Sequence, residues 1–205
     1  TKSNAKLKEG DLIHLDGKNI ELKLIEKKDY LCLFEFSESV LSVLDNFGEV
    51  PLPPYIKRPA VPVDEERYQT VYADPGKLNS VAAPTAGLHF NHSHLEQLKS
   101  KGIQFAEITL NIGLGTFKPI KVQRVEDHVI HQEKISVDLD TVKTILKAKK
   151  EGRRVIAIGT TVLRCLESVA TDFSALEPYE GETSLYIYPG YQFKIVDALL
   201  TNFHL

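Results

Sequence analysis

A proline-rich stretch early in the chain most constrains what this sequence can fold into. Residues Val50–Pro62 read VPLPPYIKRPAVP and hold five of the ten prolines. Proline fixes φ and has no backbone N–H to donate, so the stretch is excluded from helix interiors and central strands. We therefore expect an extended connector here, and we place a domain boundary between residues 1–49 and residues 50–205.

The segment before the connector is predicted to be rich in β-structure. Apolar and polar residues alternate over Asn19–Glu26 and again over Tyr30–Phe36. Alternation with a period of two is typical of half-buried strands, and the short gap between these two fits a hairpin. Ser39–Phe47 then predicts a short helix that is capped by a serine and has Gly48 at its C′ position.

The segment after the connector alternates between strand-like and helix-like stretches. Helices are predicted where a polar cap precedes an amphipathic run that a glycine ends. Strands alternating with helices favour an α/β fold with at least some parallel pairing, so we expect a mixed-sheet α/β domain. The predicted helices are 91–101, 140–151 and 162–170, and the predicted strands are 105–112, 154–158 (buried), 184–188 and 192–198.

Composition excludes several classes of protein. Hydrophobic residues make up 42 % and charged residues 26 % of the 205 residues, as in a globular protein. No apolar run approaches the roughly 20 residues of a membrane span, and no signal peptide is evident, so we expect a cytoplasmic protein without a membrane partner. Cys32 and Cys165 are expected to be free thiols.

Two further features bear on what the chain represents. The sequence contains no Met and stops directly after an apolar run and TNFHL, so we expect it to be a piece of a longer protein. The formal net charge is −3. Because there is no overall basic excess, any contact with nucleic acid is expected to be local.

Two stretches of small residues are candidates for close approach to a ligand. Val81–Phe90 reads VAAPTAGLHF, and its His89 could exchange protons near neutral pH. The alternative is a packed loop with a structural histidine. Ile112–Phe117 reads IGLGTF and follows a predicted strand, where ligands bind in open α/β sheets. It lacks the third glycine and the helix of a dinucleotide fingerprint.

Titratable residues gather in DHVIHQE, which contains His128, His131 and Glu133. Imidazole and carboxylate groups side by side suit general acid–base catalysis. A metal site built from these residues, or from the second group His89, His92 and His94, is an alternative, but HExxH and a cysteine pair are both absent. A polar surface run is a third interpretation.

The segment Val155–Ser168 predicts an anion site. A buried strand runs into Gly159, Thr160 and Thr161, and a helix follows. The N-terminus of a helix presents unpaired N–H groups, which favour a carboxylate or phosphate. Arg164 lies nearby, although it could instead form an ion pair with Glu167 one turn later.

A basic cluster between residues 143 and 154 has two interpretations. Such a run is most often a solvated helix face. It could also contact phosphates, with Lys147, Lys150, Arg153 and Arg154 as the candidate residues.

Seven motifs follow one another along the chain: PLPPYIKRP, YQTVYA, VAAPTAGLHF, IGLGTFKPI, EDHVIHQE, VIAIGTTVLRCLES and YPGYQFKIVDALLTNFHL. In this order they resemble one family, the S-adenosylmethionine:tRNA ribosyltransferase-isomerases of queuosine biosynthesis. The resemblance is dense from Val50 to Leu205 and loose before Gly48. Small departures such as Ile130 and Val162-Leu163 are conservative.

The resemblance implies a fold and an activity. Residues 1–49 would be the C-terminal part of an inserted β-barrel domain, and residues 50–205 part of an α/β catalytic domain. The enzyme would transfer and isomerise the ribosyl group of S-adenosylmethionine onto the 7-aminomethyl-7-deazaguanine wobble base of tRNA, giving epoxyqueuosine, adenine and methionine. S-adenosylmethionine would then be a substrate, with no regenerated cofactor and no metal, and we expect a monomer.

The resemblance also implies roles for particular residues of this chain. The acid–base group would be His89, His128, His131 and Glu133. Substrate contacts would come from Thr85, Gly87, Gly113, Gly115, Thr116, Gly159, Thr160, Thr161, Arg164, Asp197 and Asn202, with His204 a further candidate. Contacts to tRNA would come from Tyr68 and Tyr72, from the basic residues Lys147, Lys150, Arg153 and Arg154, and by stacking from Tyr55 or Phe117.

Two other functions remain open from sequence alone. The chain could be an RNA- or ligand-binding module without catalysis, or a metal-dependent hydrolase that uses its histidine clusters.

Overall fold

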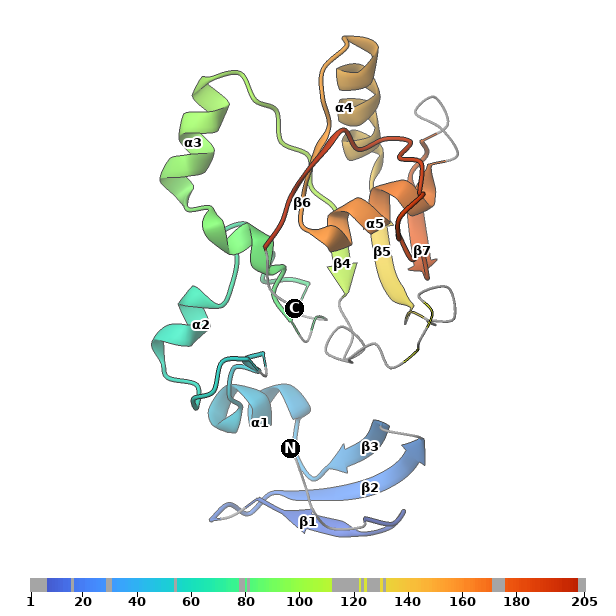
Figure 1. The fold of residues 1–205 in the computed structure, drawn as a ribbon. Helices are drawn as coiled ribbons and strands as arrows, with labels where there is room; N and C mark the ends of the chain where they lie inside the picture. Colours follow the sequence, from blue (N-terminus) through green and yellow to red (C-terminus); the bar gives the residue numbers. More distant parts are fainter. Residues whose placement is uncertain are drawn as a thin grey trace. The chain divides into compact units, whose positions relative to one another are not determined.

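The chain forms two compact units, residues 1–49 and residues 50–205 (Figure 1). A computed structural model describes residues 7–15, 17–28, 31–53, 55–77, 80, 82–111, 122, 124, 130, 132–170 and 176–202. Within these ranges, no helix is long and apolar enough to cross a membrane.

The first unit is an antiparallel sheet followed by a helix. Strands β1 (Leu12–His14), β2 (Glu21–Lys28) and β3 (Leu31–Phe36) lie in that order, which confirms the predicted β-hairpin. Leu24 is fully buried, as the alternation of apolar residues requires. That the unit belongs to a β-barrel stays a prediction.

Helix α1 (Val40–Phe47) confirms the predicted short helix of the first unit. Ser39 is its N-cap residue, although the Ser39 side chain makes no capping hydrogen bond. Gly48 is the C-cap rather than C′, with φ of −70°, so a left-handed conformation is not the reason for glycine here. A side chain at Gly48 would instead collide with the carbonyl oxygen of Leu44.

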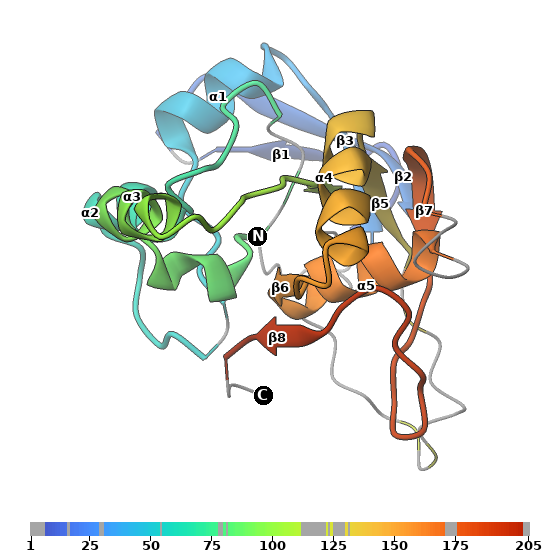
Figure 2. The same cartoon turned by 90° about the horizontal axis from the view of Figure 1, so that it is seen from above.

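The second unit contains two small sheets with helices packed on them. Strands β4 (Thr109–Asn111), β5 (Glu133–Val137) and β7 (Tyr179–Thr183) form an antiparallel sheet in that order. Strands β6 (Ile156–Ile158) and β8 (Ala198–Leu200) pair in parallel, side by side in Figure 2. The mixed-sheet α/β fold is therefore confirmed.

Helices α4 (Leu139–Lys150) and α5 (Thr160–Val169) enclose the core of this unit. Apolar side chains from β5, both helices and β6 meet those of the segment before β8. The buried core residues are Ile135, Val137, Val142, Ile145, Ala157, Leu163, Cys165, Leu166, Ala170, Leu176, Ile195 and Val196.

Polar caps decide where two predicted helices begin. In α3 (His92–Ser100) the side chain of Asn91 accepts the N–H of His94, 2.8 Å away. Asp138 accepts the N–H of Thr141 at 2.7 Å in the same way at the start of α4. These bonds satisfy N–H groups that have no partner inside the helix, and both helices lie where the sequence predicts them.

Two short helical segments were not expected. Helix α2 (Val63–Arg67) follows the proline-rich connector, and a 3₁₀ turn, η1, covers Thr85–His89. Arg58 in the connector donates two hydrogen bonds, 2.6 and 2.7 Å long, to the carboxylate of Asp64 in α2. Within the second unit, this ion pair therefore joins the connector to the helix that follows it.

Several predicted strands are wrong or shorter than predicted. Residues 184–188 are not a strand, and of residues 192–198 only Ala198 is, as the first residue of β8, although the turn at Pro189-Gly190 between the two segments is present. Side chains of α5 bond to backbone groups of these two segments. Arg164 donates to the carbonyl of Leu185, and Glu167 accepts hydrogen bonds from the N–H groups of residues 194–196. A ladder cannot form where side chains already hold these groups.

The other two predicted strands are reduced to three residues each. Of residues 105–112, only Thr109–Asn111 form a strand, and Phe105 is exposed; Ile112 lies outside the described residues. Of residues 154–158, only Ile156–Ile158 do, and the strand is not buried throughout, because Ile156 is 52 % exposed while Ala157 is buried.

Candidate functional site

The parallel strands β6 and β8 end together and lead into the candidate site. Their register pairs Ile158 with Leu200, and the N–H of Gly159 bonds to the carbonyl of Leu200 at 2.8 Å. Ligands of open α/β sheets bind beyond the carboxyl ends of parallel strands. The residues that follow these two strands, Gly159 to Thr161 and Asn202, are therefore brought to one edge.

Helix α5 begins at this edge, two residues before the predicted start at residue 162, and neither Thr160 nor Thr161 is its cap. Its N-cap residue is Gly159, with φ of 95°, a conformation that residues with a side chain rarely adopt. Thr160 and Thr161 lie in the first turn of the helix instead. Their backbone N–H groups have no acceptor inside the helix, and the first turn carries no acidic residue, so an anion would not be repelled here.

The 3₁₀ turn η1 packs against the start of α5. Ala86 of η1 is buried, and a Cβ atom at Gly159 would lie 3.7 Å from the Cβ of Ala86. Residues some 70 positions apart in the chain are thus in van der Waals reach. The VAAPTAGLHF and VIAIGTTVLR motifs form one surface.

Asn202 connects the end of β8 with both ends of η1. Its Oδ1 lies 2.5 Å from Nε2 of His89, and its Nδ2 donates to Oγ1 of Thr85 at 3.2 Å. His89 itself is exposed. Asn202 is therefore hydrogen-bonded to two other predicted site residues, Thr85 and His89.

Tyr72 closes the other side of η1 and explains the glycine at position 87. A side chain on buried Gly87 would overlap the hydroxyl oxygen of Tyr72 and the methyl group of Thr70. Burial, and then the negative charge of Glu107, raise the pKa of the Tyr72 hydroxyl. Tyr72, predicted to contact tRNA, lies beside the turn that carries His89. Tyr68 is half-buried, and burial raises the pKa of its hydroxyl as well.

Arg164 pairs across the core and not with Glu167 one turn later. Its Nη1 donates to Oε2 of Glu133 on β5 at 2.6 Å, and its Nε donates to the carbonyl of Leu185 at 2.8 Å. Both charged side chains are largely buried. Nη2 of Arg164 is buried and has no acceptor among the described residues. Burial, and then the nearby Glu133, raise the pKa of Cys165 to about 12, so this free thiol stays protonated.

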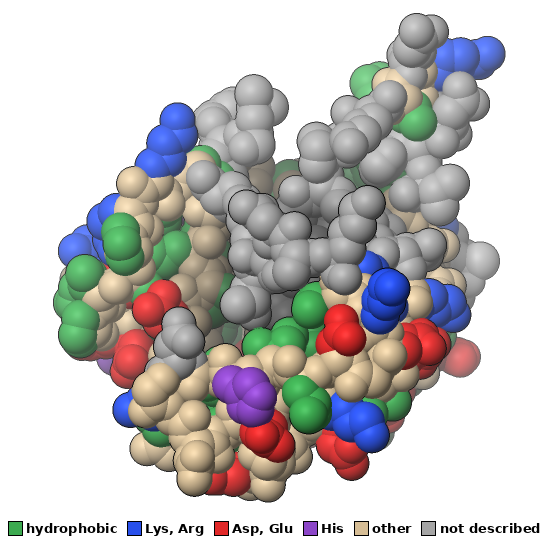
Figure 3. Space-filling view, turned by 90° about the horizontal axis from the view of Figure 1, so that it is seen from below, with side chains coloured by type: hydrophobic (Ala, Val, Ile, Leu, Met, Phe, Trp, Pro, Cys, Tyr) green, Lys and Arg blue, Asp and Glu red, His purple; other side chains and the backbone are tan. Residues whose placement is uncertain are grey.

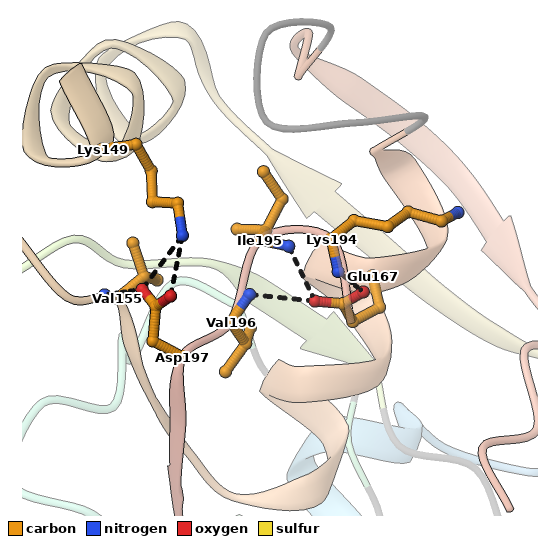
Figure 4. A network of polar contacts seen from close by, with 7 residues as sticks. All are labelled: Lys149, Val155, Glu167, Lys194, Ile195, Val196 and Asp197. Carbon is orange, nitrogen blue, oxygen red and sulfur yellow. Dashed lines mark hydrogen bonds and ion pairs between the residues drawn. The ribbon is translucent and has the colours of Figure 1, made fainter. Parts of the chain in front are cut away.

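Glu167 has a structural role that sequence reasoning missed. Figure 4 shows its carboxylate bonded to the backbone N–H groups of Lys194, Ile195 and Val196, at 2.8, 3.0 and 2.9 Å. The hydroxyl of Tyr191 adds a fourth contact at 3.3 Å. The sequence did contain one indication of this role. Glu167 lies on the same face of α5 as Leu163, Leu166 and the C-cap residue Ala170, which are all apolar, so its side chain is directed into the core.

Asp197 lies at the amino end of β8, away from Asn202 at the other end. Its carboxylate accepts Nζ of Lys149 at 2.8 Å and the N–H of Val155 at 2.7 Å (Figure 4). Burial acts to raise the pKa of Asp197, but these hydrogen bonds outweigh it and the pKa is lowered. Through these two bonds Asp197 links α4 and the start of β6 to the start of β8.

The predicted basic cluster is partly neutralised by neighbouring side chains. Arg153 contacts Glu151 at 2.6 Å and Gln104 at 2.9 Å, and Arg154 is exposed near Asp197. Lys147 and Lys150 are exposed on α4. On the face drawn in Figure 3, acidic and basic side chains are interspersed among the described residues.

The rest of the predicted site lies outside the described residues. These positions are Gly113, Gly115, Thr116, Phe117, His128, His131 and His204. Within the described part of the chain, no three His, Cys, Asp or Glu side chains come together as a group that could hold a metal ion.

Comparison with known proteins gives one consistent result. A sequence model of the family described as "Queuosine biosynthesis protein" matches residues 1–205. Two proteins named S-adenosylmethionine:tRNA ribosyltransferase-isomerase, from Legionella pneumophila strains Paris and Lens, are each 48 % identical over all 205 residues. The chain spans 59 % of the length of these relatives.

A solved structure is also similar in sequence. It is the S-adenosylmethionine tRNA ribosyltransferase of Thermotoga maritima, which is 28 % identical to this chain. The match covers 98 % of this chain and 52 % of that one, with a TM-score of 0.46.

Proposed function

The chain belongs to the queuosine biosynthesis protein family, and on that premise we propose that it forms part of an S-adenosylmethionine:tRNA ribosyltransferase-isomerase. The names of relatives that are 48 % identical over the whole chain support this proposal. Because the chain spans 59 % of those relatives, the activity is proposed for the protein of their full length.

The proposed reaction moves the ribosyl group of S-adenosylmethionine onto the aminomethyl group of a 7-aminomethyl-7-deazaguanine wobble base in tRNA. Isomerisation then gives epoxyqueuosine, and adenine and methionine leave. S-adenosylmethionine is consumed as a substrate, and no regenerated cofactor or metal is part of the proposal. The wobble base, the monomeric state and a cytoplasmic location are predictions from the sequence.

One observation carries this proposal to particular residues. The carboxyl ends of β6 and β8, the start of α5 and the turn η1 meet at one edge, and His89 is exposed there. The sulfonium group of S-adenosylmethionine acidifies the adjacent C5′–H, so the reaction needs a base. Imidazole is the side chain best suited to exchange protons at neutral pH. We therefore assign proton transfer to His89.

The start of α5 is the proposed site for an anionic group of the substrates. The N–H groups of its first turn, contributed by Thr160, Thr161 and Val162, suit the carboxylate of the methionine moiety or a tRNA phosphate. Arg164 and Glu133 are bonded to each other, so they would act as a pair. His128, His131, Gly113, Gly115 and Thr116 keep their predicted roles in acid–base catalysis and in the nucleoside pocket.

Contacts to tRNA are proposed on two surfaces of the second unit. Tyr72 is 39 % exposed beside η1, where an unpaired base could stack. Lys147 and Lys150 on α4 are exposed and suit the phosphate backbone. Arg153 is less available, because Glu151 already partners its guanidinium group.

Release of adenine tests the proposal. The full-length parent protein is incubated with S-adenosylmethionine and tRNA that carries the aminomethyl base, and adenine and epoxyqueuosine are quantified. We expect both products, and we expect His89→Gln to reduce turnover by about 10²–10⁴-fold. Thr201→Val, an exposed neighbour of Asn202, serves as the control.

Other outcomes separate the alternatives. Binding of tRNA without adenine release would favour a binding module. Stoichiometric zinc by elemental analysis, together with loss of activity on chelation, would favour a metal-dependent hydrolase. Near-normal turnover in His89→Gln would remove His89 from the mechanism while leaving the family activity intact.

A further inference from the structure

The amide of Asn202 is held at both of its polar atoms, and this determines how it meets His89. Nδ2 donates to Oγ1 of Thr85, and Oδ1 faces Nε2 of His89. An amide oxygen can only accept a hydrogen bond. With the amide in this orientation, Nε2 of His89 carries the proton of this contact.

A neutral imidazole has one N–H and one lone pair. If Nε2 carries the hydrogen, Nδ1 carries the lone pair. We infer that Asn202 and Thr85 are positioning residues that hold His89 as the Nε2–H tautomer and leave Nδ1 as the proton acceptor of the site. This inference adds detail to the proposed function. It rests on that function only for the identity of the proton that Nδ1 takes.

The orienting group is an amide and not a carboxylate, which has a chemical consequence. Residues 85–89 and 198–202 contain no Asp, Glu, Lys or Arg, so His89 is the one titratable side chain in these two segments. When Nδ1 takes a proton, the ring becomes an imidazolium, and its Nε2–H still donates to Oδ1 of Asn202. The amide cannot accept that proton, so it stays on the ring until it is passed back through Nδ1 or to solvent.

The two anchors of this arrangement are themselves fixed. At the end of β8, the carbonyl of Leu200 is bonded to the N–H of Gly159 at 2.8 Å. Within η1, Gly87 is enclosed by Tyr72 and Thr70. Because a backbone hydrogen bond holds the end of β8 and side chains enclose η1, the amide lies between two fixed segments and the orientation of the ring is restricted.

Nitrogen NMR of the imidazole ring tests the tautomer directly in the 205-residue chain. The protein is labelled with ¹⁵N-histidine, and His89→Gln identifies the resonances of His89 among those of the seven histidines. Above neutral pH we expect one nitrogen shift typical of a protonated ring nitrogen, at Nε2, and one typical of a lone pair, at Nδ1. The reverse orientation of the amide would protonate Nδ1, and that result would overturn the inference.

Matched variants then separate positioning from packing. In Asn202→Ala and Thr85→Val we expect the two nitrogen shifts of His89 to move toward each other, because an unrestrained ring exchanges between tautomers. Thr85→Ser keeps the hydroxyl and should preserve the wild-type shifts, as should the neighbouring Thr201→Val. Unchanged shifts in both Asn202→Ala and Thr85→Val would contradict the positioning role.

Kinetics of the full-length parent protein give an independent readout. A positioning residue acts on the chemical step, so Asn202→Ala should lower kcat about tenfold or more while the KM for S-adenosylmethionine changes less than threefold. A raised KM with unchanged kcat would instead assign Asn202 to substrate binding and overturn the inference. If the parent releases no adenine, the proposed function fails, while the tautomer measurement still decides the inference.

Discussion

The carboxylate of Glu167 in α5 is bonded to the backbone N–H of Val196, 29 positions later, at 2.9 Å. The same side chain accepts the N–H groups of Lys194 and Ile195, and it is 1 % exposed. Glu167 therefore fixes the backbone of residues 194–196, which lead into β8. Since β8 ends beside Asn202, α5 presents its N-terminus to the candidate site and also fixes the strand that completes that site.

Replacing Glu167 with Gln should destabilise the protein strongly. The amide keeps one acceptor oxygen but directs its NH₂ group at backbone N–H groups, so buried donors lose their partner. We expect a loss of about 3 kcal/mol in the free energy of unfolding, measured by urea denaturation. Glu177→Gln, at an exposed position, should change it by less than about 0.5 kcal/mol. Equal effects of the two variants would contradict the structural role of Glu167.

The Arg164–Glu133 pair should behave as one unit in a double-mutant cycle. Arg164→Met and Glu133→Gln each remove one partner of this buried ion pair, and each should cost about 3 kcal/mol of unfolding free energy. The double variant should cost clearly less than the sum, because no unpaired charge remains. Strict additivity in urea denaturation would mean that the 2.6 Å contact contributes nothing.

The ion pair between Arg58 and Asp64 should make stability depend on acid pH. Hydrogen bonds from Arg58, and then from the N–H of Val61, lower the pKa of Asp64 to about 2. In the unfolded chain the pKa is about 3.9, so the pair stabilises the fold above about pH 4 and loses its effect as pH falls toward 2.

Thermal unfolding of Asp64→Asn and the wild type at several pH values measures this effect. The difference in Tm should be full at pH 7 and should shrink between about pH 4 and pH 2. Asp140, whose side chain is 92 % exposed, provides the control substitution Asp140→Asn, with little difference at any pH. A Tm difference that persists unchanged at pH 2 would argue against the shifted carboxyl group.

Gly87→Ala should disturb the turn that carries His89. The added methyl group would overlap the hydroxyl oxygen of Tyr72, so we expect a loss of about 1–3 kcal/mol in unfolding free energy. Tyr72→Phe removes that oxygen, and the same glycine substitution should then cost less. An equal cost in both backgrounds would show that Tyr72 does not determine the need for glycine.

The proposed contact of α4 with RNA is tested through its salt dependence. For the full-length parent protein, Lys147→Gln with Lys150→Gln should weaken tRNA binding and reduce the slope of log K against log[salt] by about 0.7–0.9 per lost phosphate contact. Lys101→Gln, an exposed lysine at the end of α3, is the matched control. An unchanged slope would remove α4 from the tRNA interface.

Local chemistry in the sequence was sufficient to predict much of the fold. The β2–β3 hairpin, α3 and α4 all follow from periodicity and from caps such as Asn91 and Asp138, which act within a few residues. The motifs also identified the family. The segments around 184–198 defeated prediction, because their backbone groups are satisfied by Arg164 and Glu167, about 20 to 30 positions away.

For the candidate site, the sequence by itself determined which residue types were available: small residues near position 86, His89, a glycine before a helix, and Asn202. Tertiary structure alone decided which of them meet. It brought His89 into contact with Asn202, 113 positions away. It also paired Arg164 with Glu133 instead of Glu167, and Asp197 with Lys149. The physical reason is the separation of the partners along the chain. Periodicity and capping reflect contacts between residues within one turn or one strand. Polar partners that are distant in sequence are chosen only when the chain packs, because buried polar groups then have to find hydrogen-bond partners.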